Sequence, residues 1–350
     1  MNYFFKLVIF GVFLLPYNSF GQETNLIKFL STGKEDGSLL LKAYLNPLVE
    51  GLSYGMNGGW YHTAKAHKGF GLDIGISVNA VFIPTGKYFF DPLDLGLQTM
   101  TKFSSTSPNG LAPTVMGPDV VTTYQVTVDT NQDGNPDQVL SFEGPGGVDM
   151  KNNIGMSAVP VPILQIGLGL FNKTDIKIRY TPNHQYGQSK IQLLGVGIMH
   201  DIKQHIGGIK YYSFDMSLFA GYSRIDGITG LEGKFNKPLD DPRKQQLQYF
   251  TEAWVAQILA SKKIKFVTFY GGLGYNAIFT KAEVQGGYVV ASNTLVGDWV
   301  LTDPIAVGFK NFSPRITGGL RFQLGALYIF GDYTFQEYQT VSVGMGLTVK

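Results

Sequence analysis

The chain of 350 residues contains no cysteine and few charged residues. Without cysteine it can form neither a disulfide framework nor a cysteine-based zinc or redox site. Charged residues make up 15 % of the sequence, well under the roughly 25 % of ordinary soluble domains. Lysine plus arginine number 28 against 26 acidic residues. This near balance gives no electrostatic basis for binding nucleic acid or an acidic membrane surface.

A long hydrophobic run is also missing beyond the N-terminus, which argues against a helical membrane protein. Glycine (44), tyrosine (19) and phenylalanine (25) are abundant instead. These residues are typical of strands, tight bends and the aromatic belts at membrane interfaces. Low charge combined with many aromatics therefore favours a membrane β-barrel.

Residues 1–21 are predicted to be a signal peptide. Lys6 precedes an almost unbroken apolar stretch, Leu7–Leu15, and Ser19–Gly21 supplies small residues before a cleavage point at Gln22. The alternative is a membrane anchor, but the stretch is shorter than the roughly 20 residues that cross a bilayer. The signal peptide predicts export, and the expected location is the outer membrane.

The mature chain alternates between apolar and polar residues many times, which is the pattern of β-strands. The alternation is clear at 71–80, 175–181, 213–223, 315–324 and 341–349. It is less clean at about 52–62, 164–171, 190–203, 247–260, 264–279 and 326–336. Most of these segments approach the roughly 9–11 residues of a tilted membrane strand. We therefore predict an all-β protein, an antiparallel transmembrane β-barrel. A soluble sandwich is the alternative.

The strand number follows from the links between segments. Bacterial barrels have short periplasmic turns, long outer loops and an even number of strands. The long links at 225–246 and 280–314 then lie outside if the C-terminus is periplasmic. Eleven alternating segments are found, so we expect about 12 strands, with a range of 10–14. The missing strand is at 38–46 or within 83–163.

The segment before the first clear strand also fits a helix. In Glu35–Val49, Leu41, Leu45 and Leu48 lie roughly on one face, and Pro47 falls near the end. We expect residues 22–50 to form a plug in the barrel mouth, although 38–46 remains a candidate strand. Residues 51–350 would form the barrel, with a long insertion at about 83–163.

Several charged residues fall on the polar face of the predicted strands. They are Asp73, Asp175, Lys177, Arg179, Asp215, Arg315, Arg321 and Asp332. A pore lined by both signs would not select strongly between ions. We expect such charges to pair across a filled lumen instead.

One motif has a chemistry of its own. Asp129, Asn131, Asp133 and Asp137 place oxygen-bearing side chains at positions 1, 3, 5 and 9 of a loop, with Gly134 at position 6. Calcium prefers such hard oxygen ligands. Asn135 would add a backbone carbonyl. The spacing resembles bacterial extracellular calcium repeats. The alternative is a polar hairpin without metal. No other cofactor is expected.

No enzyme signature is found. The five histidines form no HExxH motif, and no G-x-S-x-G nucleophile context occurs. His200, Asp201 and His205 lie near a strand end and could imitate part of a serine-protease triad. We predict that the protein has no catalytic residues.

Several stretches resemble an uncharacterised family of bacterial outer-membrane barrels known only as a domain of unknown function. They are 41–47, 58–64, 177–182, 195–203 and 214–222. A looser similarity is to long-chain fatty-acid transporters, which pair an N-terminal plug with a barrel. That similarity implies an architecture and no substrate residues.

The predicted function is passive transport of small or hydrophobic solutes across the outer membrane. The alternative is a structural barrel whose long loops bind a partner at the cell surface. The expected partners are outer-membrane lipid and, during insertion, the barrel-assembly machinery.

The calcium site can be tested by proteolysis. We expect calcium to protect the 120–142 hairpin of the parent protein from protease, and Asp133→Ala to abolish this protection. Identical cleavage of the parent with calcium and with a chelator would show that no site exists.

Overall fold

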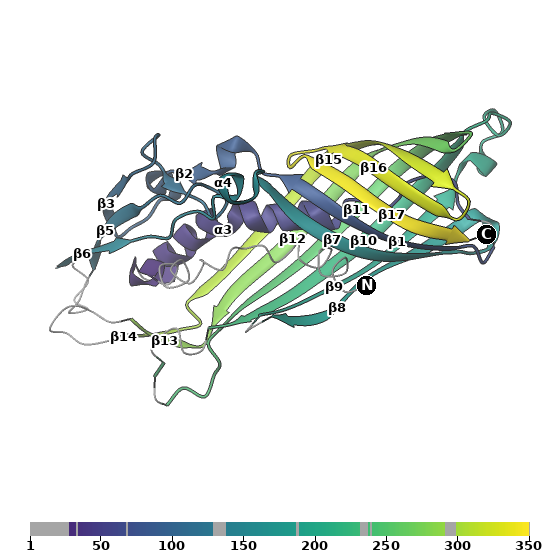
Figure 1. Ribbon diagram of the computed structural model, residues 1–350. Helices are drawn as coiled ribbons and strands as arrows, with labels where there is room; N and C mark the ends of the chain where they lie inside the picture. Colours follow the sequence, from purple (N-terminus) through teal and green to yellow (C-terminus); the bar gives the residue numbers. More distant parts are fainter. Residues whose placement is uncertain are drawn as a thin grey trace.

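The computed structural model is a closed barrel of ten antiparallel strands (Figure 1). It describes residues 28–32, 34–67, 69–128, 138–186, 189–231, 237–238, 240–290 and 299–349. The strands around the wall follow the order β1-β17-β16-β15-β12-β11-β10-β9-β8-β7. Their bounds are Leu72–Phe82 (β1), Ala158–Gly169 (β7), Thr174–Tyr186 (β8), Ser189–Asp201 (β9), Asp215–Gly230 (β10), Gln246–Ile264 (β11), Val267–Gln285 (β12), Ile305–Leu324 (β15), Leu327–Phe335 (β16) and Thr340–Val349 (β17).

The two faces of the wall differ as the alternation predicts. Outward side chains form an apolar band, and Leu273, Phe312 and Val343 are 61 %, 63 % and 60 % exposed. Inward side chains such as Ser217 and Asn276 are polar and buried. An apolar exterior around a polar interior is the pattern of a membrane barrel. The predicted barrel class is confirmed.

The wall has ten strands rather than the roughly 12 expected, and ten is the lower limit of the predicted range of 10–14. Ten of the eleven alternating segments overlap the strands of the wall. The surplus segment, 52–62, is the end of a helix and the turns that follow it. The candidate strand at 38–46 lies in the same helix, and 83–157 contributes no strand to the wall among its described residues.

That helix, α3 (Lys34–Met56), enters the barrel. It lies against β1, β7, β11, β12 and β15, which belong to different sides of the wall, so its second half is inside the lumen. Residues 57–67 continue from it without regular structure to the end where β1 begins. We call residues 34–67 the lumen segment. Among the described helices, none is both long and apolar enough to cross a bilayer.

A cap covers the mouth through which α3 enters (Figure 1). We define the cap as residues 83–128 and 138–157, between β1 and β7. It contains η2 (Thr85–Lys87), β2 (Phe89–Phe90), η3 (Pro92–Leu95), β3 (Met100–Ser105), β4 (Ala112–Pro113), β5 (Thr122–Val128), β6 (Gln138–Glu143) and α4 (Met150–Ile154). The remaining elements are η1 (Phe29–Thr32), η4 (Phe171–Lys173), η5 (Lys203–His205) and the hairpin β13 (Gly287–Val290) with β14 (Trp299–Thr302).

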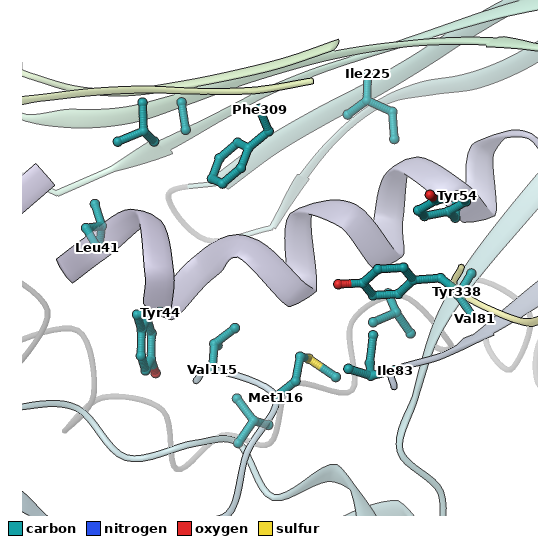
Figure 2. Close-up of a cluster of buried hydrophobic side chains, with 14 of the residues drawn as sticks. Leu41, Tyr44, Tyr54, Val81, Ile83, Val115, Met116, Ile225, Phe309 and Tyr338 are labelled. Carbon is teal, nitrogen blue, oxygen red and sulfur yellow. The ribbon is translucent and has the colours of Figure 1, made fainter. Parts of the chain in front are cut away.

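Apolar packing joins α3, the cap and the wall (Figure 2). Tyr44 of α3 lies beside Val115 of the cap, and Phe309 of the wall lies on the other side of the helix. The Tyr44 hydroxyl donates to the Gly146 carbonyl at 2.7 Å. Burial raises the pKa of this phenol above its usual range, so it remains a neutral donor. Apolar side chains of α3, the cap and the wall therefore pack together in the mouth.

The two ends of the barrel differ in the length of their links. The links 170–173, 202–214, 265–266 and 325–326, which we call short, lie at the end that carries the C-terminus. The long links 83–157, 231–245 and 286–304 lie at the opposite end, together with the start of α3. The last two are shorter than predicted, because β10 continues to Gly230 and β12 and β15 reach 19 and 20 residues. The lumen segment therefore runs from the long-link end to the short-link end.

This direction can be tested by cysteine labelling, since the chain has no cysteine of its own. Glu35 lies at the long-link end and Lys265 in a short link, and both are exposed. With short links in the periplasm, a membrane-impermeant maleimide should label Glu35→Cys on intact cells. It should label Lys265→Cys only after permeabilisation. The reverse result would contradict the orientation.

Candidate functional site

The wall is interrupted between β7 and β8. β7 pairs with β1 over its length from Ala158 to Leu168. It pairs with β8 only from Gln165 to Gly169, opposite Arg179 to Asp175. Toward the long-link end, β7 runs to the cap while β8 stays beside β9 (Figure 1). We call residues 158–164 of β7 and 180–186 of β8 the seam. No pairing across it occurs within these described residues.

The direction of the β7 amides explains why the pairing stops. Gly169 donates its N–H to Gly71, on the β1 side, at 2.8 Å. Leu170 donates to Thr174, on the β8 side, at 2.6 Å. Successive amides of a strand point to opposite neighbours. Even-numbered residues of β7 must therefore supply the N–H groups that a ladder with β8 would use.

Prolines occupy the seam at these positions. Pro160 and Pro162 are even-numbered residues of β7 and have no N–H to donate. Their missing donors face β8, so the ladder with β1 is preserved. On the other edge, Pro182 lies where the β8–β9 register shifts, between Thr181 and His184. The sequence itself thus excludes a regular ladder across the seam.

The seam lies at the depth of the apolar band. Val78 and Ala80 of β1, which are partners of Pro162 and Pro160, belong to the outward apolar face. Leu164, at the lower end of the seam, is 41 % exposed. The unpaired edges therefore belong to the apolar part of the outer surface.

Helix α3 lies directly behind the seam, on its lumen side. The inward side chains Val159, Val161 and Ile163 are buried in the cluster that includes α3. A Cβ added to Gly51 would lie 3.5 Å from Val159 Cβ, and one added to Gly55 only 2.4 Å from Val161 Cγ2. Glycine at these two positions allows the helix backbone to pack directly on β7.

Side chains of the wall bind the carbonyl groups at the end of α3. A helix leaves its last carbonyls without partners inside the helix. Asn79 donates to the Gly55 carbonyl at 2.7 Å. Arg179 donates to the carbonyls of Met56 and Gly58, at 2.7 and 2.8 Å. Arg315 donates to the carbonyl of Asn57. Two buried arginines therefore complement the negative end of the helix dipole.

Arg315 reaches this carbonyl from β15, on another side of the lumen. It donates to the Asn57 carbonyl at 2.8 Å and to Asn276 Oδ1 at 3.1 Å. Asn57 in turn donates to Asn276 Oδ1 at 3.0 Å. The helix end is therefore held from two sides.

Arg179 also touches the base of the seam. Its Nε donates to Gln165 Oε1 at 2.9 Å, and these two residues are the last β7–β8 pair before the seam. Its guanidinium lies over the Trp60 ring at 3.6 Å from the centroid. One side chain thus connects β8, β7 and the lumen segment.

The rest of the lumen segment is bonded to the wall down to the short-link end. The Tyr61 hydroxyl donates to Gln257 at 2.9 Å, and Ser217 donates to the Ala64 carbonyl at 2.6 Å. His67 Nδ1 lies 2.8 Å from Asp175 Oδ2. In the part of the chain that the structure describes, protein occupies the lumen along its axis.

Most of the charged residues that we predicted to face the lumen do face it. Asp73, Asp175, Lys177, Arg179, Arg315, Arg321 and Asp332 are buried, and Asp215 is half-buried. Their partners are more often groups of the lumen segment than charges across the lumen. His62, for example, lies 3.4 Å from Asp73. Sequence reasoning missed this because it assigned residues 52–62 to a strand of the wall and ended the plug at residue 50.

The predicted calcium ligands Asp129, Asn131, Asp133, Asn135 and Asp137 lie outside the described residues. The strands on either side, β5 and β6, pair up to Val128 and Gln138. No group of three or more potential ligands that could hold a metal occurs in the described ranges.

The histidines near the strand end form a different arrangement from a triad. His200 Nδ1 lies 2.8 Å from Thr174 Oγ1, and His200 Nε2 lies 3.1 Å from His205 Nε2. Asp201 is not their partner but forms an ion pair with Lys173 at 3.1 Å. The described contacts of His200 therefore involve no carboxylate and no serine.

A closed antiparallel barrel with an apolar exterior and a filled polar lumen defines a class of membrane β-barrel proteins. The chain belongs to the family of unknown function DUF6588, whose model matches residues 1–349. This confirms the resemblance to an uncharacterised family. No curated protein sequence matches the chain significantly.

Solved outer-membrane proteins share a low similarity with the chain. The Yersinia pestis protein Ail is 12 % identical, over 50 % of this chain and 98 % of its own, with a TM-score of 0.24. The translocator domain of the Neisseria meningitidis autotransporter NalP is 9 % identical, over 87 % and 94 %, with a TM-score of 0.26. The Escherichia coli protease OmpT is 7 % identical, over 80 % and 95 %, also with 0.26. Similarity at this level carries no argument about function.

The role of the arginines at the helix end can be measured as stability. Arg315→Met leaves buried acceptors without a donor, and we expect it to lower the free energy of unfolding by about 2–3 kcal/mol. The measurement is the urea midpoint in detergent micelles. Arg224→Met is the control, because Arg224 is exposed and pairs with Asp226 on its own strand. An unchanged midpoint for Arg315→Met would show that the contact does not stabilise the fold.

Proposed function

We propose that the protein is an outer-membrane transporter that exchanges hydrophobic solutes with the bilayer through its side wall. The observation that carries this proposal is the seam, where proline removes the donors that would close the wall. Unpaired backbone at membrane depth is tolerated only where protein or a cavity covers it. A seam there is a costly feature for a purely structural barrel.

The filled axis supports the side wall as the route. The lumen segment, which acts as a plug in this proposal, is bonded to the wall from Gly55 to His67. A water-filled channel for small polar solutes would require this network to leave the lumen. The seam instead meets an apolar interior, which includes Val159, Val161 and Leu193. These surroundings suit a neutral hydrocarbon solute.

The proposal includes export by the signal peptide and insertion in the outer membrane with the short links in the periplasm. Its partners are outer-membrane lipid and the barrel-assembly machinery. It involves no nucleic acid and no catalytic step.

A second candidate is a surface-interaction barrel, and one observation favours it. The cap and the long strands β11, β12 and β15 gather at the long-link end (Figure 1). Strands β5 and β6, which flank the calcium motif, belong to the cap, and a calcium ion bound by that motif would rigidify this part of the cap for contact with a partner.

Uptake of a hydrophobic dye tests the side-wall route. Intact cells would express the protein and be exposed to N-phenyl-1-naphthylamine, which fluoresces in hydrocarbon. Bridging Leu164→Cys and Tyr180→Cys with a thiol crosslinker should reduce the uptake at least fivefold, because it ties the two edges of the seam and leaves its prolines in place.

The matched control is Ile166→Cys with Ile178→Cys. These residues are partners in the paired part of β7 and β8, so a crosslink between them should leave uptake unchanged. Uptake that persists with the seam tied, together with steady conductance in planar bilayers, would mean that solutes pass along the axis.

A further inference from the structure

We propose that the second half of α3, residues 48–56, is a gate that closes the seam from inside, and that Arg179 couples the gate to the seam. This inference rests on the proposed side-wall transport. It assigns the moving part and the residue that controls it.

The contact between the helix and the seam is smooth. Gly51 and Gly55 face Val159 and Val161, and no side chain of the helix projects between them at these two points. Interlocked side chains must change rotamer before two elements can separate. Glycine has no side chain, so only the two valines take part in this contact. This half of α3 can therefore move away from β7 without repacking large side chains at that contact.

A proline lies where a gate in α3 would have to bend. Pro47 lies inside α3 and has no N–H for the carbonyl of Ala43, four residues earlier. Proline is a common cause of bending in helices. The gate begins immediately after it.

The two ends of the helix are anchored differently. At its start, Asp36 accepts hydrogen bonds from the Thr99 N–H at 2.8 Å and from the Thr99 hydroxyl at 2.6 Å, and so fixes the first half of α3 to the cap. At its end, Arg179 and Arg315 hold the carbonyls.

Between these anchors, Tyr54 donates to Asn311 of β15 at 2.9 Å and Tyr338 donates to Glu50. The half beyond Pro47 can move only when these bonds and the second anchor are broken.

Arg179 links that anchor to the seam, and Arg315 does not. Arg179 belongs to β8 and bonds to Gln165 of β7, so a solute that spreads the two strands pulls on this bond. The same guanidinium holds Met56 and Gly58. Spreading of the seam therefore weakens the hold on the helix end. Arg315, on β15, gives a control that binds the helix end without touching the seam.

A disulfide between helix and wall tests the gate. A Cβ at Gly51 would lie 3.5 Å from Val159 Cβ, within the roughly 3.5–4.5 Å range of disulfides. Cells with Gly51→Cys/Val159→Cys should take up the dye when the pair is reduced. Their uptake should fall at least fivefold when the pair is oxidised. Dithiothreitol should restore it. Undiminished uptake by the oxidised variant would refute the gate while leaving side-wall transport intact.

A second measurement does not depend on transport. In the same cysteine pair, Arg179→Gln should slow disulfide formation at least threefold, because the helix spends less time against β7. Arg315→Gln should slow it less. Equal rates in all three backgrounds would refute the coupling. Absence of dye uptake in the parent protein, with a slowed rate in Arg179→Gln, would refute the transport proposal alone. Gel mobility before and after heating checks that each variant is folded.

Discussion

A strand in a bilayer depends on its neighbours for every backbone hydrogen bond, because hydrocarbon offers none. The barrel satisfies this constraint around its wall by continuous ladders, and β1 keeps its ladder with β7 even beside Pro160 and Pro162. Apart from Ile305–Arg315 of β15, which extends past the end of β16 and has no partner among the described strands on that side, the departure is the seam. Its cost is limited because α3 lies behind it and covers the inner side with apolar groups. The helix inside the lumen and the break in the wall are thus parts of one arrangement.

The same constraint explains the charges inside the barrel. A helix that ends in a lumen exposes carbonyls that must be bonded, and the wall supplies Asn79, Arg179 and Arg315 for them. Arginine suits this task because its planar fork can donate to two carbonyls at once, as Arg179 does for Met56 and Gly58. Arg179 and Arg315, which in the sequence resemble charges that line a pore, therefore bind the end of a helix.

Much of the wall could be predicted from the sequence, since alternation along one strand is a local property. The segment 52–62 was misinterpreted because Leu52, Tyr54 and Met56 alternate with small or polar residues although they belong to a helix. What holds them in a helix is bonding to distant strands, which no local pattern contains. The seam was also missed. The Val-Pro-Val-Pro run at 159–162 was its signal, but its meaning depends on which neighbour each amide faces, and this requires the register.

Arg179 marks a boundary between two environments in the lumen. Toward the long-link end, the interior behind the seam consists of side chains such as Val161, Leu193 and Ile225. Toward the short-link end, buried charges such as Asp73 and Asp175 line the lumen beside a second apolar cluster, which includes Trp60 and Phe219. A break in the wall beside the second region would let water and lipid meet across exposed charges, at a high cost in free energy. A break beside the apolar interior behind the seam joins that interior to the hydrocarbon of the bilayer. The position of the prolines therefore determines what the seam can admit: solutes that need no hydration.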